Sequence, residues 1–245
     1  MLDLVRERGL VLLGCGKMGG AMLEGWLAGG LPPGAVHVID PAPAERIVAL
    51  AGEGLHLNAA LPEAPAVVLL AVKPQVMAAA LPQVAPLGGG ATLFLSIAAG
   101  TPIATFEAAL GPATPIVRAM PNTPAAIGRG ITALIGNAAA GEEEMTLAET
   151  LLAAVGETVR LGAEAEMDAV TAVSGSGPAY VFHLIEALAA AGEAEGLAPD
   201  LALRLARATV AGAGALAAET GEDPAQLRIN VTSPGGTTAA GLGVL

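Results

Sequence analysis

The 245-residue sequence predicts an α/β fold, in which a parallel-sheet domain with crossover helices is followed by an all-α domain. In the first part, short apolar runs alternate with Ala-rich segments of helical length. The apolar runs lack the polar alternation of a half-exposed strand, which is typical of a parallel sheet covered on both faces. Strand-like runs stop near residue 162, so we expect domains at residues 1–162 and 163–245.

Five runs rich in Val, Ile and Leu, bounded by Gly, Pro or Asn, predict the first strands. They lie at residues 10–14, 35–40, 66–72, 91–97 and 114–120. Segments 18–29 and 43–51 between them are long enough for crossover helices. Residues 130–136 and 156–161 predict two more strands. The helix between them is expected to begin at "GEEE", residues 141–144, because carboxylates favour a helix N-terminus.

Residues 163–245 have a helical period, with Gly or Pro at the joints. The stretch "SGSGPAYVF", residues 174–182, is expected to open a long helix. Tyr180 and His183 are three apart and share a face of that helix, where we expect core packing. The many Ala and Gly residues allow close helix approach, which would suit an interlocked oligomer.

The composition argues against several classes of protein. A formal charge of -12 disfavours a nucleic-acid partner, because phosphate binding needs a basic face. A single cysteine, Cys15, excludes an intramolecular disulfide, and His37, His56 and His183 are too scattered for a metal site. The apolar residues are mostly Ala and Gly, and the N-terminus has no secretory cleavage pattern. We therefore expect no membrane span and a cytoplasmic protein.

The glycine-rich stretch "GCGKMG", residues 14–19, directly follows the first strand and opens a helix. In that context, a G-x-G-x-x-G pattern predicts a dinucleotide site. Gly14 permits the tight turn, Gly16 lets a pyrophosphate approach the backbone, and Gly19 lets helix and strand pack closely. The cofactor-binding loop would then comprise Gly14, Cys15, Gly16, Lys17, Met18 and Gly19. The alternative is an ordinary strand–turn–helix in Gly-rich sequence.

The end of the second strand bears on the choice of cofactor. Asp40 can hydrogen-bond a ribose 2′-hydroxyl, which favours NADH. Equally, Asp40 can be a turn residue before Pro41. Arg46 lies near the same corner and could accommodate a 2′-phosphate, so the choice between NADPH and NADH stays open.

Three more loops follow predicted strands, where open parallel sheets bind ligands. They are "AVKPQ", "SIAAG" and "AMPNTP", at residues 71–75, 96–100 and 119–124. The only two lysines, Lys17 and Lys73, both stand at such loops, which favours a functional Lys73 over a merely solvated one. Asn122 is either functional or part of a turn between prolines.

Together these motifs resemble the pyrroline-5-carboxylate reductase family over essentially the whole chain. The resemblance rests on "GCGKMGGAML", "LNAA" (57–60), "AVKP", "SIAAG", "RAMPNTPA" (118–125), "VSGSGPAYVF" (173–182) and "VTSPGGTT" (231–238), in the family's order and approximate spacing. It implies reduction of the cyclic imine 1-pyrroline-5-carboxylate to L-proline by NADPH or NADH, the last step of proline biosynthesis. It also implies interlocked homodimers, often assembled into rings such as a decamer, with the active site shared between subunits.

The resemblance assigns further site residues. Asn58 would contact the adenosine side of the cofactor. The nicotinamide end would be lined by Ala71, Val72, Lys73, Pro74 and Ala98. The substrate loop would comprise Ser233, Gly236, Thr237 and Thr238, with Thr238 as the catalytic residue beside the ring nitrogen. The substrate chemistry agrees, because a Gly-Gly loop at a helix start offers backbone N–H donors to a carboxylate. An imine that enters protonated needs no strong general acid.

Two alternative functions can each be distinguished from a pyrroline-5-carboxylate reductase by one sequence feature. A β-hydroxyacid dehydrogenase shares the plan but needs a lysine about one turn into its first interdomain helix, and no lysine follows "SGSG". A nucleotide-sensing module would need the glycine loop but not "SPGGTT". Family members usually continue past the final "GLGVL", so we expect either a truncated chain or a short member of the family.

Overall fold

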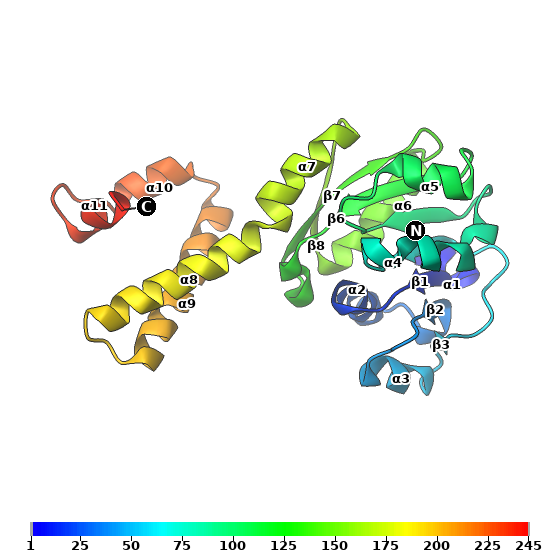
Figure 1. Ribbon diagram of the computed structural model, residues 1–245, viewed down its shortest axis with the longest axis horizontal. Coiled ribbons are helices and arrows are strands. Elements are labelled where there is room, and N and C mark those ends of the chain that lie inside the picture. Colours follow the sequence, from blue (N-terminus) through cyan, green and yellow to red (C-terminus); the bar gives the residue numbers. More distant parts are fainter. Residues whose placement is uncertain (1, 245) are drawn as a thin grey trace. The chain divides into compact units, whose positions relative to one another are not determined.

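The computed structural model describes residues 2–244 and divides into two compact units, Met1–Pro178 and Ala179–Leu245 (Figure 1). Each unit is described by itself. The division lies after Pro178 because the chain from 163 to 178, although helical, packs with the sheet. This chain comprises η6 Glu164–Glu166, α7 Met167–Val170 and the π-helix η7 Thr171–Gly175.

In the first unit, eight strands form one sheet in the order β3-β2-β1-β4-β5-β6-β7-β8. The strands are β1 Leu10–Leu13, β2 Val36–Ile39, β3 His56–Leu57, β4 Val67–Leu70, β5 Leu93–Ser96, β6 Ile116–Met120, β7 Gly130–Gly136 and β8 Gly156–Arg160. Each predicted run contains a strand, and the expected Rossmann-type plan is confirmed. The short edge strand β3, which the sequence does not predict, pairs with β2.

Strand β7 departs from the expected parallel arrangement. Pairing is parallel from β3 across to β6, but β6 and β7 are antiparallel, and β8 runs parallel to β7. The connection between β6 and β7, residues 121–129, holds only the 3-10 helix η4 Thr123–Ile127. A parallel crossover needs about a dozen residues or more. Gly128, with φ 69°, turns the chain back instead.

Helices cover both faces of the sheet, as the unbroken apolar strands predict. They are α1 Leu2–Arg8, α2 Lys17–Ala28, α3 Glu45–Ala51, α4 Pro74–Ala80, α5 Ile103–Leu110 and α6 Glu142–Leu152, with 3-10 turns η1 Pro33–Ala35, η2 Leu81–Gln83, η3 Ala85–Leu87 and η5 Ala153–Val155. One buried cluster joins Leu10 and Leu12 to α1, α2, α3 and α6. A second joins Val11 and Leu13 to α4 and α5.

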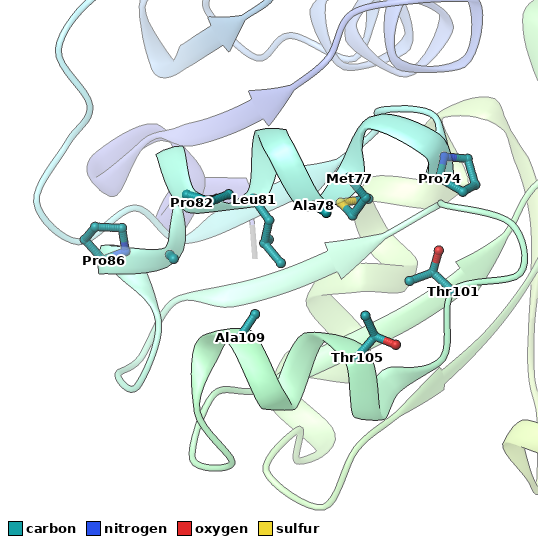
Figure 2. A pocket seen from close by; sticks show the side chains of 10 residues that line it. Pro74, Met77, Ala78, Leu81, Pro82, Pro86, Thr101, Thr105 and Ala109 are labelled. Atoms are coloured by element: carbon teal, nitrogen blue, oxygen red, sulfur yellow. The ribbon is translucent and has the colours of Figure 1, made fainter.

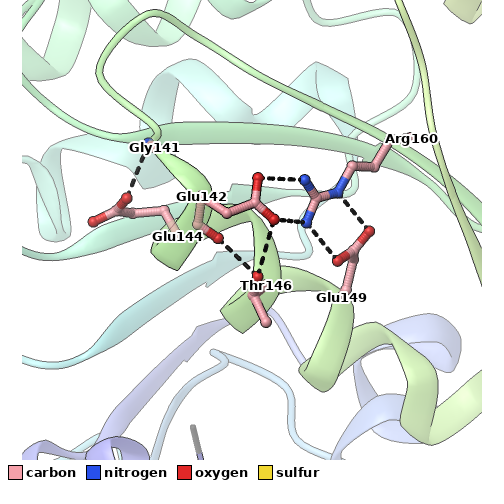
Figure 3. Close-up of polar contacts among 6 residues, drawn as sticks. All are labelled: Gly141, Glu142, Glu144, Thr146, Glu149 and Arg160. Atoms are coloured by element: carbon pink, nitrogen blue, oxygen red, sulfur yellow. Dashed lines mark hydrogen bonds and ion pairs between the residues drawn. The ribbon is translucent and has the colours of Figure 1, made fainter.

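An ion-pair network fastens α6 to β8 (Figure 3). Arg160 Nη1 lies 2.6 Å from Glu142 Oε2, and Arg160 Nε lies 2.7 Å from Glu149 Oε1. These bonds raise the pKa of Arg160 and lower the pKa values of both glutamates. Strand β8 runs opposite to β1, so its carboxyl end, where Arg160 lies, is at the amino ends of the parallel strands. The glycine loop lies at the other end of these strands. The network is therefore structural.

The second unit is helical, as expected. It contains most of α8 Gly177–Ala194, and α9 Pro199–Thr220, α10 Pro224–Asn230 and α11 Thr237–Leu242. Few of its side chains are buried. Tyr180 is 62% exposed and the His183 side chain 81%, so the expectation that they pack in the core of this chain is wrong. Among the described helices, α9 alone is long and apolar enough to cross a membrane by length and composition, which is weak evidence for a span.

Candidate functional site

The chain changes direction across the sheet between β1 and β4. From β1 it proceeds outward to β2 and β3, whereas from β4 it proceeds the other way to β5 and β6. Such a switch point opens a crevice at the carboxyl ends of the strands, where open α/β sheets bind ligands. Two of the predicted loops, residues 14–19 and 71–74, begin at this point.

The three glycines of the 14–19 loop have three different environments. Gly14 has a φ of 86°, and a Cβ there would lie 2.7 Å from Val72 Cγ1. At Gly19, a Cβ would lie 2.7 Å from the Gly14 carbonyl oxygen. At Gly16, in contrast, a Cβ would meet no protein atom within 4 Å. The backbone at Gly16 is therefore open to a ligand, and the loop fits a diphosphate lying over the start of α2.

The bases of these loops are held by backbone hydrogen bonds to adjacent strands. Gly14 N donates to Ile39 O at 2.8 Å, and Ala71 N donates to Leu13 O at 2.8 Å. In the next strand-end loop, Ala98 is buried and its N–H donates to Ser96 Oγ at 3.3 Å. Loops 14–19 and 71–74 are thus adjacent and anchored in the crevice.

Both lysines stand at this crevice. Lys17 is the first residue of α2, and Lys73 precedes Pro74 at the start of α4. Both are exposed, and neither forms an ion pair within residues 2–244. In a chain of formal charge -12, two uncompensated cations at one edge of the sheet favour an anionic ligand there.

Asp40 ties the glycine loop to the end of β2. Its Oδ2 accepts from Cys15 N at 2.7 Å, and its Oδ1 accepts from Ala42 N at 2.9 Å. The turn role is therefore present in the structure. Each carboxylate oxygen still has a lone pair that could accept from a ribose hydroxyl.

Asn58 holds the main chain of Asp40 from the other side. Asp40 N donates to Asn58 Oδ1 at 3.0 Å, and Asn58 Nδ2 donates to Asp40 O at 2.8 Å. Asn58 adopts a φ of 50°, a left-handed conformation that Asn tolerates better than most residues. The two residues form one hydrogen-bonded corner at the adenosine end of the predicted site.

Cys15 has no nucleophilic role in this arrangement. Its side chain is buried, and burial, followed by the nearby charges of Asp40 and Glu24, raises the pKa of the thiol to about 12. The thiol is therefore protonated at neutral pH, and it packs under the loop as a small apolar group.

Sequence reasoning missed Arg118, whose side chain is only 10% exposed. Its Nη1 lies 2.7 Å from Glu164 Oε1, which also accepts from Ile103 N at 2.8 Å. The pair links β6 to the start of α5 and to η6. The sequence signals for it are a charged residue inside the apolar run "PIVRAM" and its place at the start of "RAMPNTPA"; its partner Glu164 lies far along the chain.

The "AMPNTP" loop lies against the π-helix η7. Asn122 Oδ1 accepts from Ile131 N at 3.0 Å, and Asn122 Nδ2 donates to Ser174 Oγ at 3.3 Å. A Cβ at Gly175 would lie 2.5 Å from Met120 Cε. The structure therefore brings residues 119–124 and the start of "SGSGPAY" together, and π-helical turns are frequent at functional sites.

The predicted substrate loop lies in the second unit. Gly235 has a φ of 70°, and Gly236 N donates to Ser233 O at 3.1 Å in a tight turn. Gly236 precedes α11, of which Thr237 is the first residue, so Thr238 lies in the first turn. Ser233, Thr237 and Thr238 are all exposed and therefore accessible to a ligand.

An apolar cavity of about 580 Å³ lies between α4 and α5 (Figure 2). Its walls include Met77, Leu81 and Thr105, and Pro74 and Thr101 mark the end near the strand-end loops. None of the side chains that line it is ionisable, so it is unsuited to the phosphates of a dinucleotide.

Two family models match the sequence. Residues 164–245 match the family described as pyrroline-5-carboxylate reductase dimerisation, and residues 10–100 match NADP oxidoreductase coenzyme F420-dependent. The chain is 43% identical over 237 residues to the pyrroline-5-carboxylate reductase of Pseudomonas aeruginosa, covering 95% of this chain and 86% of that protein. It is 36% identical over 245 residues to the Escherichia coli enzyme, covering 98% of this chain and 90% of that protein.

Solved structures agree. A pyrroline-5-carboxylate reductase from Coxiella burnetii matches with a TM-score of 0.88 at 34% identity, over 97% of this chain and 89% of that one. The Plasmodium falciparum pyrroline carboxylate reductase with NADP bound matches with a TM-score of 0.85 at 28% identity, over 98% and 90%. The chain belongs to the pyrroline-5-carboxylate reductase family.

Proposed function

We propose that this protein reduces 1-pyrroline-5-carboxylate to L-proline with NADPH or NADH, as the last step of proline biosynthesis. Family membership supports the reaction. The observation that carries the proposal is the geometry of Gly14, Gly16 and Gly19, which leaves open backbone where a dinucleotide's phosphates would lie. When bound, the reduced nicotinamide supplies a hydride to the imine carbon.

The cofactor would be held from the diphosphate outward. The glycine loop and Lys17 hold the phosphates, because free N–H groups at the start of α2 and an exposed cation both favour an anion. Asp40 and Asn58 form the adenosine corner. The nicotinamide end is lined by Ala71, Val72, Lys73, Pro74 and Ala98, with Cys15 and Met18 completing the loop.

The substrate loop would hold the substrate carboxylate. Ser233, Gly236 and Thr237 present hydroxyls and backbone donors on an exposed turn. Thr238 is assigned the ring nitrogen and is the one catalytic side chain. The imine enters protonated, so the protein's task is to align the imine carbon with the nicotinamide.

The second unit supports a proposal for the assembly. We propose that residues 1–162 bind the dinucleotide and that residues 163–245 bind substrate and form a homodimer. The exposed apolar side chains of α8 and α9 support this, including Phe182, Leu188 and Leu205. Such side chains gain stability by burial against a second copy. Dimers of this kind would assemble into a ring, such as a decamer, in the cytoplasm.

A mixing experiment tests whether subunits share the site. Gly16→Asp disables the cofactor side, and Thr238→Ala disables the substrate side. Each variant on its own should have little reductase activity. If each site takes its loops from two chains, random exchange makes hybrid dimers with one intact site, and about a quarter of wild-type activity returns. Activity no higher than the two variants give separately would mean that both loops come from one chain. Light scattering on the same samples reports the oligomeric state.

A further inference from the structure

Arg46 is the positively charged residue nearest in sequence to Asp40, at the adenosine corner. Its side chain already forms ion pairs with two carboxylates. It is the second residue of α3, directly after the β2–α3 loop. Its Nε lies 2.9 Å from Glu24 Oε1 and its Nη2 lies 3.5 Å from Glu24 Oε2, so one edge of the guanidinium faces a single carboxylate. Its Nη1 lies 3.3 Å from Glu53 Oε1. Two negative charges therefore surround one positive charge.

The loop between Asp40 and Arg46 adds no side-chain donor for a phosphate. Its sequence is "PAPAE", without hydroxyl, amide or basic side chains, and two of its residues are prolines that lack an N–H. The Ala42 N–H already donates to Asp40 Oδ1. A phosphate on the ribose 2′-oxygen would thus meet Asp40 with no ready counter-ion.

The negative charge also reaches the glycine loop. Asp40 bonds directly to Cys15 N at 2.7 Å. After burial, the charges of Asp40 and Glu24 are the next causes that raise the pKa of the Cys15 thiol. Both carboxylates therefore act at the loop that would hold the cofactor, and they oppose the extra negative charge of a 2′-phosphate, which NADH lacks.

We infer that the Glu24–Arg46 pair makes this enzyme select NADH over NADPH, with Glu24 as a specificity-determining residue. A 2′-phosphate that approached Arg46 would find its positive charge already paired with two carboxylates, those of Glu24 and Glu53. NADH makes no such demand, because its ribose hydroxyl can donate to Asp40. This inference rests on the proposed cofactor site.

Equilibrium binding to the full-length protein tests it without turnover. The probes are 5′-AMP and 2′,5′-ADP, which differ only by the 2′-phosphate, together with NADH and NADPH, measured by titration calorimetry. We expect the wild-type protein to bind NADH about tenfold or more tightly than NADPH, with the same order for the fragments. Glu24→Gln, which keeps the shape but removes one of the two negative charges paired with Arg46, should tighten 2′,5′-ADP binding about fivefold or more and leave 5′-AMP within about twofold.

Two further variants isolate the mechanism. Glu45→Gln removes an equal charge from the residue next to Arg46 but breaks none of its bonds, so its gain for 2′,5′-ADP should be much smaller. Glu24→Gln/Arg46→Met should lose the gain altogether. Equal or tighter NADPH binding by the wild-type protein would overturn the inference. So would equal gains from the two Glu→Gln variants, or a gain that survives without Arg46. If neither dinucleotide binds, the proposed cofactor site itself is wrong.

Discussion

Gly16→Ala should separate cofactor binding from folding. A Cβ at Gly16 meets no protein atom within 4 Å, and the backbone there has φ -72°, which alanine adopts freely. The free energy of unfolding should therefore stay within about 0.5 kcal/mol of the wild-type value. The new methyl group would instead occupy the space through which the diphosphate approaches the start of α2.

The size of the binding loss follows from the hydrogen bonds at stake. A charge-assisted bond contributes about 1.5–3 kcal/mol. Displacing the diphosphate far enough to break one backbone bond should therefore raise the Kd for NADH about 10- to 100-fold. The measurement is a fluorescence titration with NADH, paired with urea unfolding of the same sample.

Neighbouring glycines provide matched comparisons. At Gly19, a Cβ would lie 2.7 Å from the Gly14 carbonyl oxygen, so Gly19→Ala should lower the free energy of unfolding by about 1–3 kcal/mol. At Gly20, the nearest atom is Cys15 O at 3.9 Å, and Gly20→Ala should stabilise α2 by about 0.5–1 kcal/mol. Unchanged NADH affinity in Gly16→Ala, or a loss of stability equal to that of Gly19→Ala, would refute the roles given to these glycines.

Three other predictions concern single side chains. Because burial and neighbouring carboxylates raise the pKa of Cys15 to about 12, the folded protein should react very slowly with iodoacetamide at pH 8, and rapid alkylation would show that the thiol is accessible as thiolate. Burial, and then the charge of His56 stacked at 4.2 Å, lowers the pKa of His37. The unfolded chain therefore takes up a proton first as the pH falls below about 6.5, so the free energy of unfolding should drop there, and His37→Leu should show a smaller drop in urea titrations at pH 7.5 and 5.5. Thr238→Ala should lower kcat for pyrroline-5-carboxylate about 10-fold or more while the Kd for NADH stays within about twofold, and wild-type turnover would remove Thr238 from the mechanism.

The central strands β1, β4 and β5 were predictable because they are buried on both faces, so each apolar run marks a strand. Strand β3 was not, because only His56 and Leu57 pair with β2, and two residues make no pattern. The reversal at β7 was also missed. Strand direction depends on the length and turn of the preceding connection, here through Gly128, and not on the apolar run itself.

At the candidate site, the sequence identified residues whose role depends on the local backbone. It did not identify residues whose role depends on a partner far away in the sequence. The glycine pattern has a local meaning, so the environments of Gly14 and Gly19 follow from spacing alone. The engagement of Arg46 by Glu24, and of Arg118 by Glu164, joins residues far apart in sequence. Only the fold brings these charges together, so the sequence left the choice of cofactor open and did not identify Arg118.

The most direct test is an assay of the purified protein with 1-pyrroline-5-carboxylate and each reduced cofactor, following absorbance loss at the nicotinamide band and L-proline by chromatography. We expect one L-proline formed for each cofactor oxidised, and faster oxidation of NADH than of NADPH. Oxidation of neither cofactor in the presence of substrate, by protein that binds NADH, would contradict the reductase function and favour a nucleotide-sensing role.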